Sequence, residues 1–315
     1  MNCPICNNPQ VQVVMQSFDD RYGYPGEFAL MQCQHCGHAF LDCTLSPGQL
    51  TELYTHYYPR KSFDIANFKP HSEQSGFFAW FNGLACSAFR WVPKNVRVLD
   101  VGCGFGESLG YHTARGCDVY GVEADENIRR VVEKFGYKVH VGLFDDSVYG
   151  AEFFDTVTMD QVIEHVTDPQ SILRGVARIM KPGGKLILST PNANGWGAKI
   201  FGRRWINWHT PYHLQFFSKQ SMQKAAEQAG FEVTEIKTIT NSDWLLFQWI
   251  HLVTYPKLGQ SSWFWSPNKE GETLPQKLAA RLMSLVHKTR VNHLLTRIFD
   301  SAGWGDNFVF VLTKR

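Results

Sequence analysis

Residues 96–114 constrain the fold more than any other part of the sequence. They begin with an apolar run rich in β-branched residues and pass through a glycine turn: Val96-Arg97-Val98-Leu99-Asp100-Val101-Gly102-Cys103-Gly104-Phe105-Gly106. A helix-forming stretch follows at 107–114, and this order is typical of a buried parallel strand, a turn and a helix. The glycines allow the backbone to approach a ligand closely, where any Cβ would collide.

The same alternation continues along the chain. We expect strands at 119–122, 138–141, 155–159, 185–189 and 231–239, and helices at 125–135, 169–180 and 218–229. Asp168-Pro169 is a helix start and Pro182-Gly183-Gly184 a helix stop. Alternating strands and helices predict an α/β fold with a parallel, doubly wound sheet, whose ligands bind at the carboxyl ends of the strands.

The glycine spacing separates two kinds of cofactor. The dinucleotide fingerprint is GxGxxG, but its last position is Glu107 here, and an acidic side chain at a helix start opposes a pyrophosphate. A GxGxG turn preceded by Asp100 instead suits a ligand with a cationic amino-acid end. Glu123 closes the next strand, where a carboxylate can accept hydrogen bonds from both hydroxyls of a ribose.

These residues carry a family resemblance. The run 98–106 resembles the first motif of class I S-adenosylmethionine methyltransferases, and segments 154–157, 163–169 and 180–186 with Leu173 resemble the ubiquinone-biosynthesis-like branch. The resemblance implies a Rossmann-like seven-stranded methyltransferase sheet that ends in an antiparallel strand at 307–313. It also implies S-adenosylmethionine as the cofactor.

By the same resemblance, each part of the cofactor has its own residues. Asp100, Gly102 and Gly104, with Cys103, would hold the methionine end. The ribose would bind Glu123, with Ala124 beside it, Phe144 and Asp145 would flank the adenine, and Asp160 and Gln161 would lie beside the sulfonium.

The first forty residues contain two CxxC units, Cys3-Pro4-Ile5-Cys6 and Cys33-Gln34-His35-Cys36. Each unit places two thiolates on one side of a tight loop, and Asn7 and Gly37 stand where a left-handed backbone would close each knuckle. Four sulfurs in a tetrahedron form a closed structural zinc site, so we expect Zn²⁺ at Cys3, Cys6, Cys33 and Cys36. A redox dithiol is the alternative, and His35, His38 or Cys43 could replace one ligand.

We expect four parts in the chain. They are a zinc-binding knuckle module at 1–43, a helical connector at 44–94, the methyltransferase domain at 95–240 and 301–315, and an aromatic insertion at 241–300. The connector should contain helices at 46–54 and 76–91. The insertion leaves from the carboxyl end of a strand, so it could be a lid that stacks on the acceptor, a patch that contacts membrane-bound lipid-linked substrate, or a dimer surface.

A methyl acceptor that reacts through oxygen needs a general base, because the hydroxyl proton must leave. Histidines follow the fourth and fifth strands at the correct edge of the sheet, and we predict that the base is His165, His209 or His213. Some relatives bind Mg²⁺ through an acidic residue three positions before the Glu-His pair. That position is Gln161 here, which argues against a catalytic metal.

Charge and composition narrow the partners. The 315 residues carry a net charge of +2 with scattered Lys and Arg, which argues against a nucleic-acid partner. Eight cysteines without a secretory signal, and without an apolar run of membrane length, indicate the cytoplasm.

The leading hypothesis is O-methylation of a small molecule, namely a sugar hydroxyl in glycan or natural-product biosynthesis. An RNA base methyltransferase and an inactive zinc-anchored scaffold are the alternatives. A third is a sugar C-methyltransferase, because the knuckles resemble the N-terminus of zinc-containing sugar C-methyltransferases, although those carry an extra C-terminal domain. The oligomeric state is not encoded in these patterns.

Overall fold

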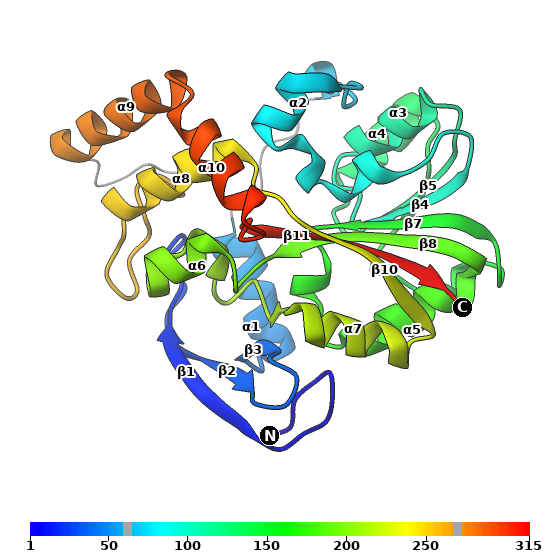
Figure 1. The fold of residues 1–315 in the computed structure, drawn as a ribbon, viewed down its shortest axis with the longest axis horizontal. Helices are drawn as coiled ribbons and strands as arrows, with labels where there is room; N and C mark the ends of the chain where they lie inside the picture. Colours follow the sequence, from blue (N-terminus) through cyan, green and yellow to red (C-terminus); the bar gives the residue numbers. More distant parts are fainter. Residues whose placement is uncertain (59–64, 267–272) are drawn as a thin grey trace.

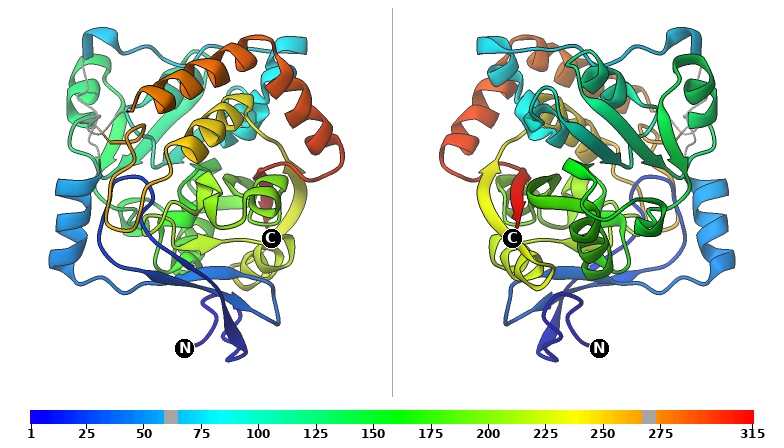
Figure 2. Two further views of the ribbon diagram at one scale, coloured as in Figure 1. Left: turned by 90° about the vertical axis from the view of Figure 1, so that its left-hand side faces the viewer. Right: turned by 90° about the vertical axis from the view of Figure 1, so that its right-hand side faces the viewer.

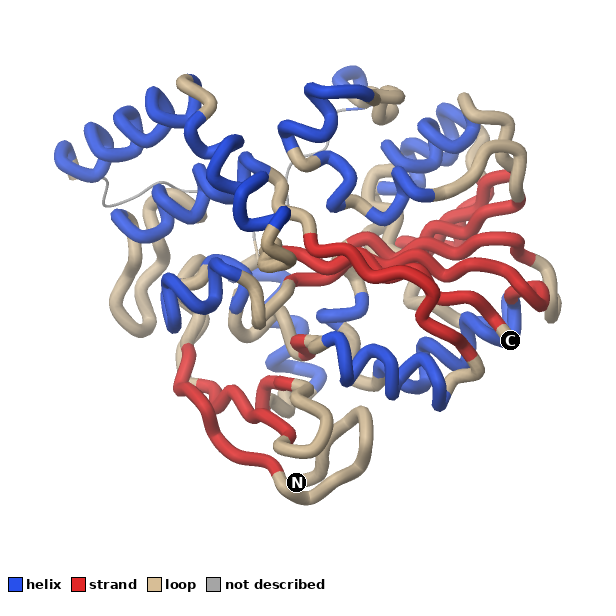
Figure 3. Tube along the Cα trace, in the orientation of Figure 1, coloured by secondary structure: helices blue, strands red, loops and turns tan. Residues whose placement is uncertain are grey.

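The computed structural model describes residues 1–58, 65–266 and 273–315. Its centre is a seven-stranded sheet in the order β10-β11-β8-β7-β4-β5-β6, which Figure 3 shows as one twisted layer. The strands are β4 (Arg97–Val101), β5 (Asp118–Glu123), β6 (Lys138–Val141), β7 (Phe154–Asp160), β8 (Met180–Pro191), β10 (Phe231–Thr238) and β11 (Asn307–Lys314). Neighbours from β4 to β8 run parallel, whereas β11 is antiparallel to both β8 and β10. The predicted α/β methyltransferase sheet is therefore confirmed.

Helices cover both faces of this sheet. Figure 1 shows α3 (Glu107–Thr113) and α4 (Ile128–Phe135) on one face, and α5 (Pro169–Ile179) and α7 (Lys219–Gln228) on the other. The layers meet in fully buried apolar side chains, among them Leu99, Phe154 and Phe310. Burial of this kind is the main stabilising force of a doubly wound domain.

The helix predicted at 125–135 begins only at Ile128. The side chain of Asp125 accepts a hydrogen bond from the backbone N–H of Asn127 at 2.9 Å, and Glu123 accepts one from Asp125 at 2.8 Å. These local side-chain bonds hold residues 124–127 in turns and delay the helix.

The N-terminal residues form a second, antiparallel sheet. It contains β1 (Val11–Ser17), β2 (Phe28–Cys33) and β3 (Ala39–Asp42). Its fourth strand, β9 (Gln215–Phe216), comes from the larger domain and follows β8 in the sequence. Because β9 pairs with β3, this sheet is joined to the larger domain by backbone hydrogen bonds. The helix α1 (Pro47–Glu52) follows, with the Ser46 cap and Pro at its start that the sequence predicts.

A helical lobe packs beside the sheet. It contains α2 (Gly76–Asn82), α8 (Ser242–Val253), α9 (Leu274–Lys288) and α10 (Val291–Ser301), and Figure 2 shows these helices gathered at one end of the molecule. A further helix, α6 (Trp196–Phe201), lies between β8 and β9. Short helical turns occur at Leu53–Tyr57, Ile65–Asn67, Leu84–Cys86, Ala88–Trp91, Asp146–Val148, Ile163–His165, Gly202–Arg204 and Ile206–Trp208. None of the helices in the described ranges is long and apolar enough to cross a membrane.

The connector is less regular than the sequence predicts. One helix was expected at 76–91, but α2 ends at Gly83, which has φ +73° and a left-handed conformation. A Cβ at Gly83 would overlap the carbonyl oxygen of Thr240 and the guanidinium of Arg297. The close approach of three chain segments therefore requires glycine here, and this contact breaks the helix.

Candidate functional site

The glycine turn after β4 takes the shape that its sequence predicts. Gly102, Gly104 and Gly106 have φ values of +73°, +57° and +86°, which side chains disfavour. A Cβ on Gly102 would lie 2.5 Å from Cγ2 of Val162, whereas a Cβ on Gly104 would meet nothing within 4 Å. Gly102 is therefore required by packing, and Gly104 leaves open space at the carboxyl end of the strand.

Asp100 lies beneath this turn and is almost completely buried. Its carboxylate accepts hydrogen bonds from the hydroxyls of Ser108 and, at 2.7 Å, Thr158. Burial raises the pKa of Asp100 to about 6, while the two hydroxyl donors oppose that rise. Asp100 thus anchors the turn to α3 and β7 from below.

Glu123 supports the turn from the neighbouring strand. One carboxylate oxygen accepts from the N–H of Gly104 at 2.8 Å and the other from the N–H of Asp125 at 2.8 Å. A carboxylate offers about four lone-pair sites, so two remain for a ligand. Ala124 is exposed beside it, and Cys103 is buried with its Sγ directed at Gly121.

The residues predicted to flank the adenine follow β6. Phe144 is half-buried and packs against the core, where a Cβ on Gly175 would lie 3.1 Å from its ring. Asp145 is exposed, and its carboxylate accepts from the N–H of Ser147 at 2.8 Å. This hydrogen bonding holds the pKa of Asp145 below its usual value.

Asp160 and Gln161 end β7 at the same edge of the sheet. Asp160 accepts from the N–H of Ala88 at 3.0 Å and from the hydroxyl of Ser189, and burial raises its pKa. Gln161 has φ +57°, and its amide donates to Ser189 at 3.0 Å and to Asn307 at 2.8 Å. A left-handed backbone at a non-glycine residue is strained, and such strain clusters at functional sites.

A polar cavity of about 90 Å³ opens beside these two residues. Its lining comes from several distant segments: Cys86, Ser87, Asp160, Gln161, Asn207, Thr240, Asn241, Trp244, Asp306 and Asn307. Most of these residues have an amide, a hydroxyl or a carboxylate, and Trp244 provides aromatic surface.

His165 and His213 lie close to Glu164. One ligand atom from each of these three lies within 4.8 Å of the others. Nδ1 of His165 faces the carbonyl of Tyr212 at 2.9 Å and must therefore donate, which leaves Nε2 as the acceptor of the neutral ring. Burial lowers the pKa of His165 to about 4 and raises that of Glu164 to about 8.

The other two candidate histidines are more enclosed. Nδ1 of His213 donates to the carbonyl of Asn207 at 2.8 Å, and its Nε2 faces Nδ1 of His209 at 3.4 Å. His209 and His213 are buried, which lowers the pKa of both rings well below the ordinary value, whereas His165 is only half-buried. The structure thus brings all three predicted histidines together, and His165 is the most accessible.

The four cysteines of the two CxxC units converge. Sγ of Cys3 lies 3.6 Å from that of Cys36, Sγ of Cys6 lies 3.5 Å from that of Cys33, and all four lie within 4.8 Å of one another. Asn7 and Gly37 have φ values of +55° and +68°, as the knuckle prediction requires.

The residues named as possible replacement ligands have other surroundings. His35 contacts Lys224 at 3.1 Å, and His38 is buried against Gln215 at 2.9 Å. The cluster of four thiols forms without these histidines and without Cys43.

Several residues at the site are not predicted from the sequence. His71 stacks on Phe89 at 4.8 Å and lies near Asp160 and Glu107, and burial lowers its pKa. Thr240, Asp306 and Asn307 line the cavity from the far side. No local motif marks them, because only the packing of the connector and the insertion brings them to the sheet edge.

The aromatic insertion contributes fewer side chains to the cavity than its composition suggests. Among the aromatic residues of 241–300 that the structure describes, Trp244 lines the cavity and the others do not. Phe247 and Trp265 pack against a buried cluster that includes Leu30 of the N-terminal sheet and Trp205. Phe264 contacts both of them, and Trp249 donates to Asn292 at 3.3 Å.

Comparisons with known proteins identify relatives of this chain. A family model described as "Methyltransferase domain" matches residues 58–236. The chain is 30% identical over 169 residues to a ubiquinone biosynthesis O-methyltransferase of Thiobacillus denitrificans, covering 48% of this chain and 73% of the relative. It is 31% identical over 170 residues to the protein of that name from Xanthomonas axonopodis pv. citri, covering 49% and 70%. Among solved structures it is similar to a phosphoethanolamine N-methyltransferase 2 of Haemonchus contortus with bound S-adenosylmethionine, at 19% identity and a TM-score of 0.46, covering 75% of this chain and 52% of that one.

The family match spans more than half of the chain and includes the glycine turn, Glu123, and the Asp160–Gln161 edge of the sheet. The chain therefore belongs to the methyltransferase-domain family and is a class I S-adenosylmethionine-dependent methyltransferase.

Proposed function

We propose that this methyltransferase transfers a methyl group to the hydroxyl of a small polar acceptor, and that a sugar hydroxyl is the acceptor class. The polar cavity beside Asp160 and Gln161 is the observation that carries the proposal. Its amides and carboxylates suit a molecule with several hydroxyls, and Trp244 offers a flat apolar surface. The relatives are named as O-methyltransferases, which supports oxygen as the acceptor atom.

The cofactor site is proposed on the open space at Gly104 and the two remaining acceptor sites of Glu123. When bound, S-adenosylmethionine supplies an activated methyl group, so that the protein's main task is alignment. We assign the amino-acid end to the turn around Asp100, the ribose to Glu123, the adenine to Phe144 and Asp145, and the reacting end to Asp160 and Gln161.

His165 is the proposed general base. Its neutral ring has an acceptor at Nε2, because Nδ1 donates to the carbonyl of Tyr212. Nε2 would accept the proton of the acceptor hydroxyl, while bound S-adenosylmethionine would supply the methyl group. His213 is proposed to hold the His165 ring in place, since the two ring centroids lie 4.6 Å apart.

The four cysteines are proposed to bind one structural Zn²⁺. Thiolate sulfurs are the ligands that closed zinc sites use, and the short knuckles have little apolar core of their own. The 1–43 module would then be fixed by metal and by the β3–β9 pairing, while the 241–300 insertion would form a wall of the acceptor site through Asn241 and Trp244.

Methyl transfer from radiolabelled S-adenosylmethionine to a panel of acceptors tests this proposal. The panel contains sugar nucleotides, free sugars, ubiquinone precursors and ribosomal RNA. We expect methyl transfer to sugar hydroxyls. The variant Trp244→Ala should transfer the methyl group more slowly and should bind S-adenosylhomocysteine as the wild type does. Transfer to RNA, or to a sugar carbon, would overturn the acceptor assignment.

A further inference from the structure

The helical lobe exposes an unusual amount of apolar side chain. On α9 the exposed residues are Leu274, Leu278, Leu282 and Leu285, each at least 54% exposed. Successive residues rotate by about 100° around a helix axis, so these four leucines lie within one narrow stripe. The residues on the opposite side, including Ala280 and Met283, are half-buried, and α9 packs mainly on α8. The leucine stripe therefore faces solvent and not the protein.

The neighbouring helices extend this apolar surface. Val291, Leu294 and Ile298 on α10 are 46–56% exposed and share one side of that helix. Phe77, Phe78 and Trp80 on α2 are 57–73% exposed, and both α9 and α2 pack against α10. We call these ten residues of α2, α9 and α10 the apolar face.

Positive charge accompanies the apolar face. Between residues 274 and 299 the sequence contains five basic residues and no Asp or Glu. Arg297 is buried and pairs with Asp300, whereas the other four, Lys277, Arg281, Lys288 and Arg290, are exposed. Lys277, Arg281 and Lys288 are exposed and fall next to the leucine stripe on one side of α9. An apolar stripe with adjacent basic residues, and aromatic residues nearby, is the pattern of helices that lie in a membrane interface.

We propose that the apolar face docks on the surface of an anionic lipid bilayer. Anionic headgroups would pair with the basic row while the leucines, Phe77, Phe78 and Trp80 enter the boundary of the acyl chains. A second copy of the chain fits less well, because a two-fold contact through α9 would place the exposed Arg281 and Lys288 of both copies at one interface.

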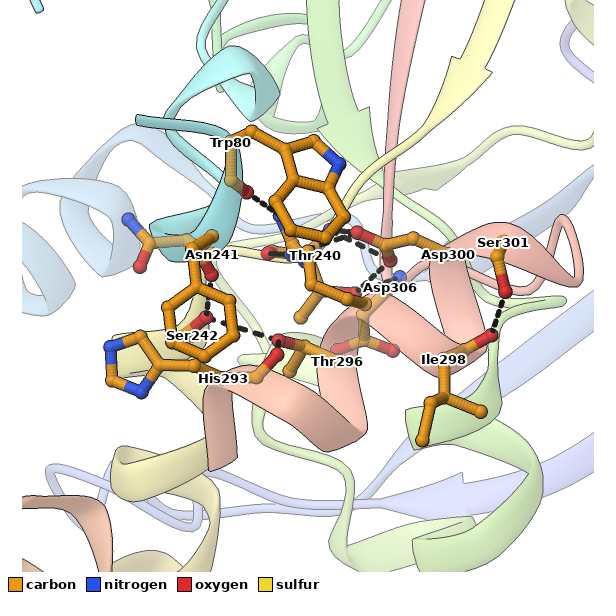
Figure 4. Close-up of polar contacts among 12 residues, drawn as sticks. Trp80, Thr240, Asn241, Ser242, His293, Thr296, Ile298, Asp300, Ser301 and Asp306 are labelled. Carbon is orange, nitrogen blue, oxygen red and sulfur yellow. Dashed lines mark hydrogen bonds and ion pairs between the residues drawn. The ribbon is translucent and has the colours of Figure 1, made fainter. Parts of the chain in front are cut away.

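The apolar face is fastened to the acceptor cavity. Figure 4 shows the polar contacts that join α10, α2 and the segment before α8, where Asp300 accepts from Thr240 and Ser242 contacts Thr296 at 3.0 Å. The hydroxyl of Thr240 in turn accepts from the N–H of Asp306 at 2.9 Å. Thr240 and Asp306 both line the cavity, so docking would place the acceptor site close to the membrane.

Vesicle flotation with the full chain tests the docking proposal, and it requires no methyl transfer. Vesicles of phosphatidylcholine alone are compared with vesicles containing equal parts of phosphatidylglycerol. We expect binding to the anionic vesicles that weakens at high salt. The double variant Leu278→Glu/Leu282→Glu should bind roughly tenfold more weakly or worse, and Arg281→Gln/Lys288→Gln roughly thirtyfold more weakly.

A matched control adds the same two charges elsewhere. Val13 and Val14 are 54% and 44% exposed on β1, which lies towards the bottom of the molecule in Figure 1, whereas α9 lies at the top. Val13→Glu/Val14→Glu should bind vesicles like the wild type, and all variants should bind S-adenosylhomocysteine equally well.

Failure of the wild type to bind anionic vesicles would overturn the proposal. So would a wild-type dimer that Leu278→Glu/Leu282→Glu converts to a monomer, because the apolar face would then be a subunit interface. Because binding is measured without an acceptor, either outcome leaves the proposed methyl transfer untouched.

Discussion

Glu123→Gln is the most direct test of the cofactor assignment. The carboxylate of Glu123 uses two of its roughly four lone-pair sites on the N–H groups of Gly104 and Asp125, which leaves two for the ribose hydroxyls. Glutamine keeps one oxygen and replaces the other by an NH₂ group that cannot accept. The variant therefore loses one of the two ribose hydrogen bonds, and the remaining ribose hydrogen bond is made to a neutral oxygen and not to a charged one.

A hydrogen bond to a charged group contributes about 1.5–3 kcal/mol. The combined loss of one bond and weakening of the second should total about 3 kcal/mol, or roughly a hundredfold increase in Kd. Isothermal titration with S-adenosylhomocysteine measures this change. Stability should fall by about 1 kcal/mol, because one backbone N–H of the turn loses its partner at a site open to water.

Glu126→Gln is the matched control for this experiment. Glu126 lies three residues away, is exposed, and pairs only with Arg129 among the ion pairs of the described residues. Exposed pairs contribute little, so its Kd should stay within roughly twofold of the wild type. If Glu123→Gln bound S-adenosylhomocysteine as well as Glu126→Gln, the ribose assignment would be refuted.

Three further changes have clear expected outcomes. Gly102→Ala should lower both Tm and cofactor affinity, because its Cβ would lie 2.5 Å from Val162. Gly104→Ala should weaken cofactor binding with a smaller fall in Tm, because its Cβ would meet no protein atom within 4 Å. Calorimetry of both variants measures Tm and affinity. Cys36→Ser should reduce zinc, measured by inductively coupled plasma mass spectrometry, from one ion per chain to well below one; a metal-free wild type would contradict it. The pKa of His165 is lowered to about 4, so the loss of activity that comes from protonating this ring should be centred near pH 4. Because the unfolded ring protonates first, at its ordinary pKa of 6.5, this ring should lower the stability as pH falls from about 6.5 to about 4. An activity loss centred near pH 6.5, absent in His165→Gln, would contradict the burial argument.

The geometry of the proposed cofactor site could be predicted from the sequence because its signals are local. The strand, turn and helix at 97–113 lie within one continuous segment, and Glu123 ends the adjacent strand, which pairs with β4 in parallel register. Parallel pairing brings both strand ends to one edge, so the sequence order alone predicts their proximity. The same reasoning located Asp160 and Gln161.

The acceptor half could not be predicted in this way. Its cavity combines Ser87, Asn207, Thr240 and Asn307, which come from four separate segments, and no periodic pattern relates them. The single helix predicted at 76–91 failed for the same reason. The sequence shows a helical apolar run, but the break at Gly83 depends on contact with residues more than 150 positions away.

This contact at Gly83 leads to a last prediction. Arg297 donates to the carbonyl oxygens of Trp80 and Thr240 and pairs with Asp300 at 2.8 Å, so the connector and the insertion are fastened to each other. Gly83→Ala would force this junction apart, since its Cβ would overlap both Thr240 and Arg297. Hydrogen–deuterium exchange should then rise in α2 and α10 while exchange in the β4 and β5 strands and the Kd for S-adenosylhomocysteine stay unchanged. An equal rise of exchange in the sheet would contradict this, because it would mean that the proposed cofactor site also depends on the junction.

The prediction follows from the contacts that stabilise the two parts of the site. Hydrogen bonds from β5, β7 and α3 hold the glycine turn, whereas a junction between two segments outside the sheet holds the proposed acceptor wall.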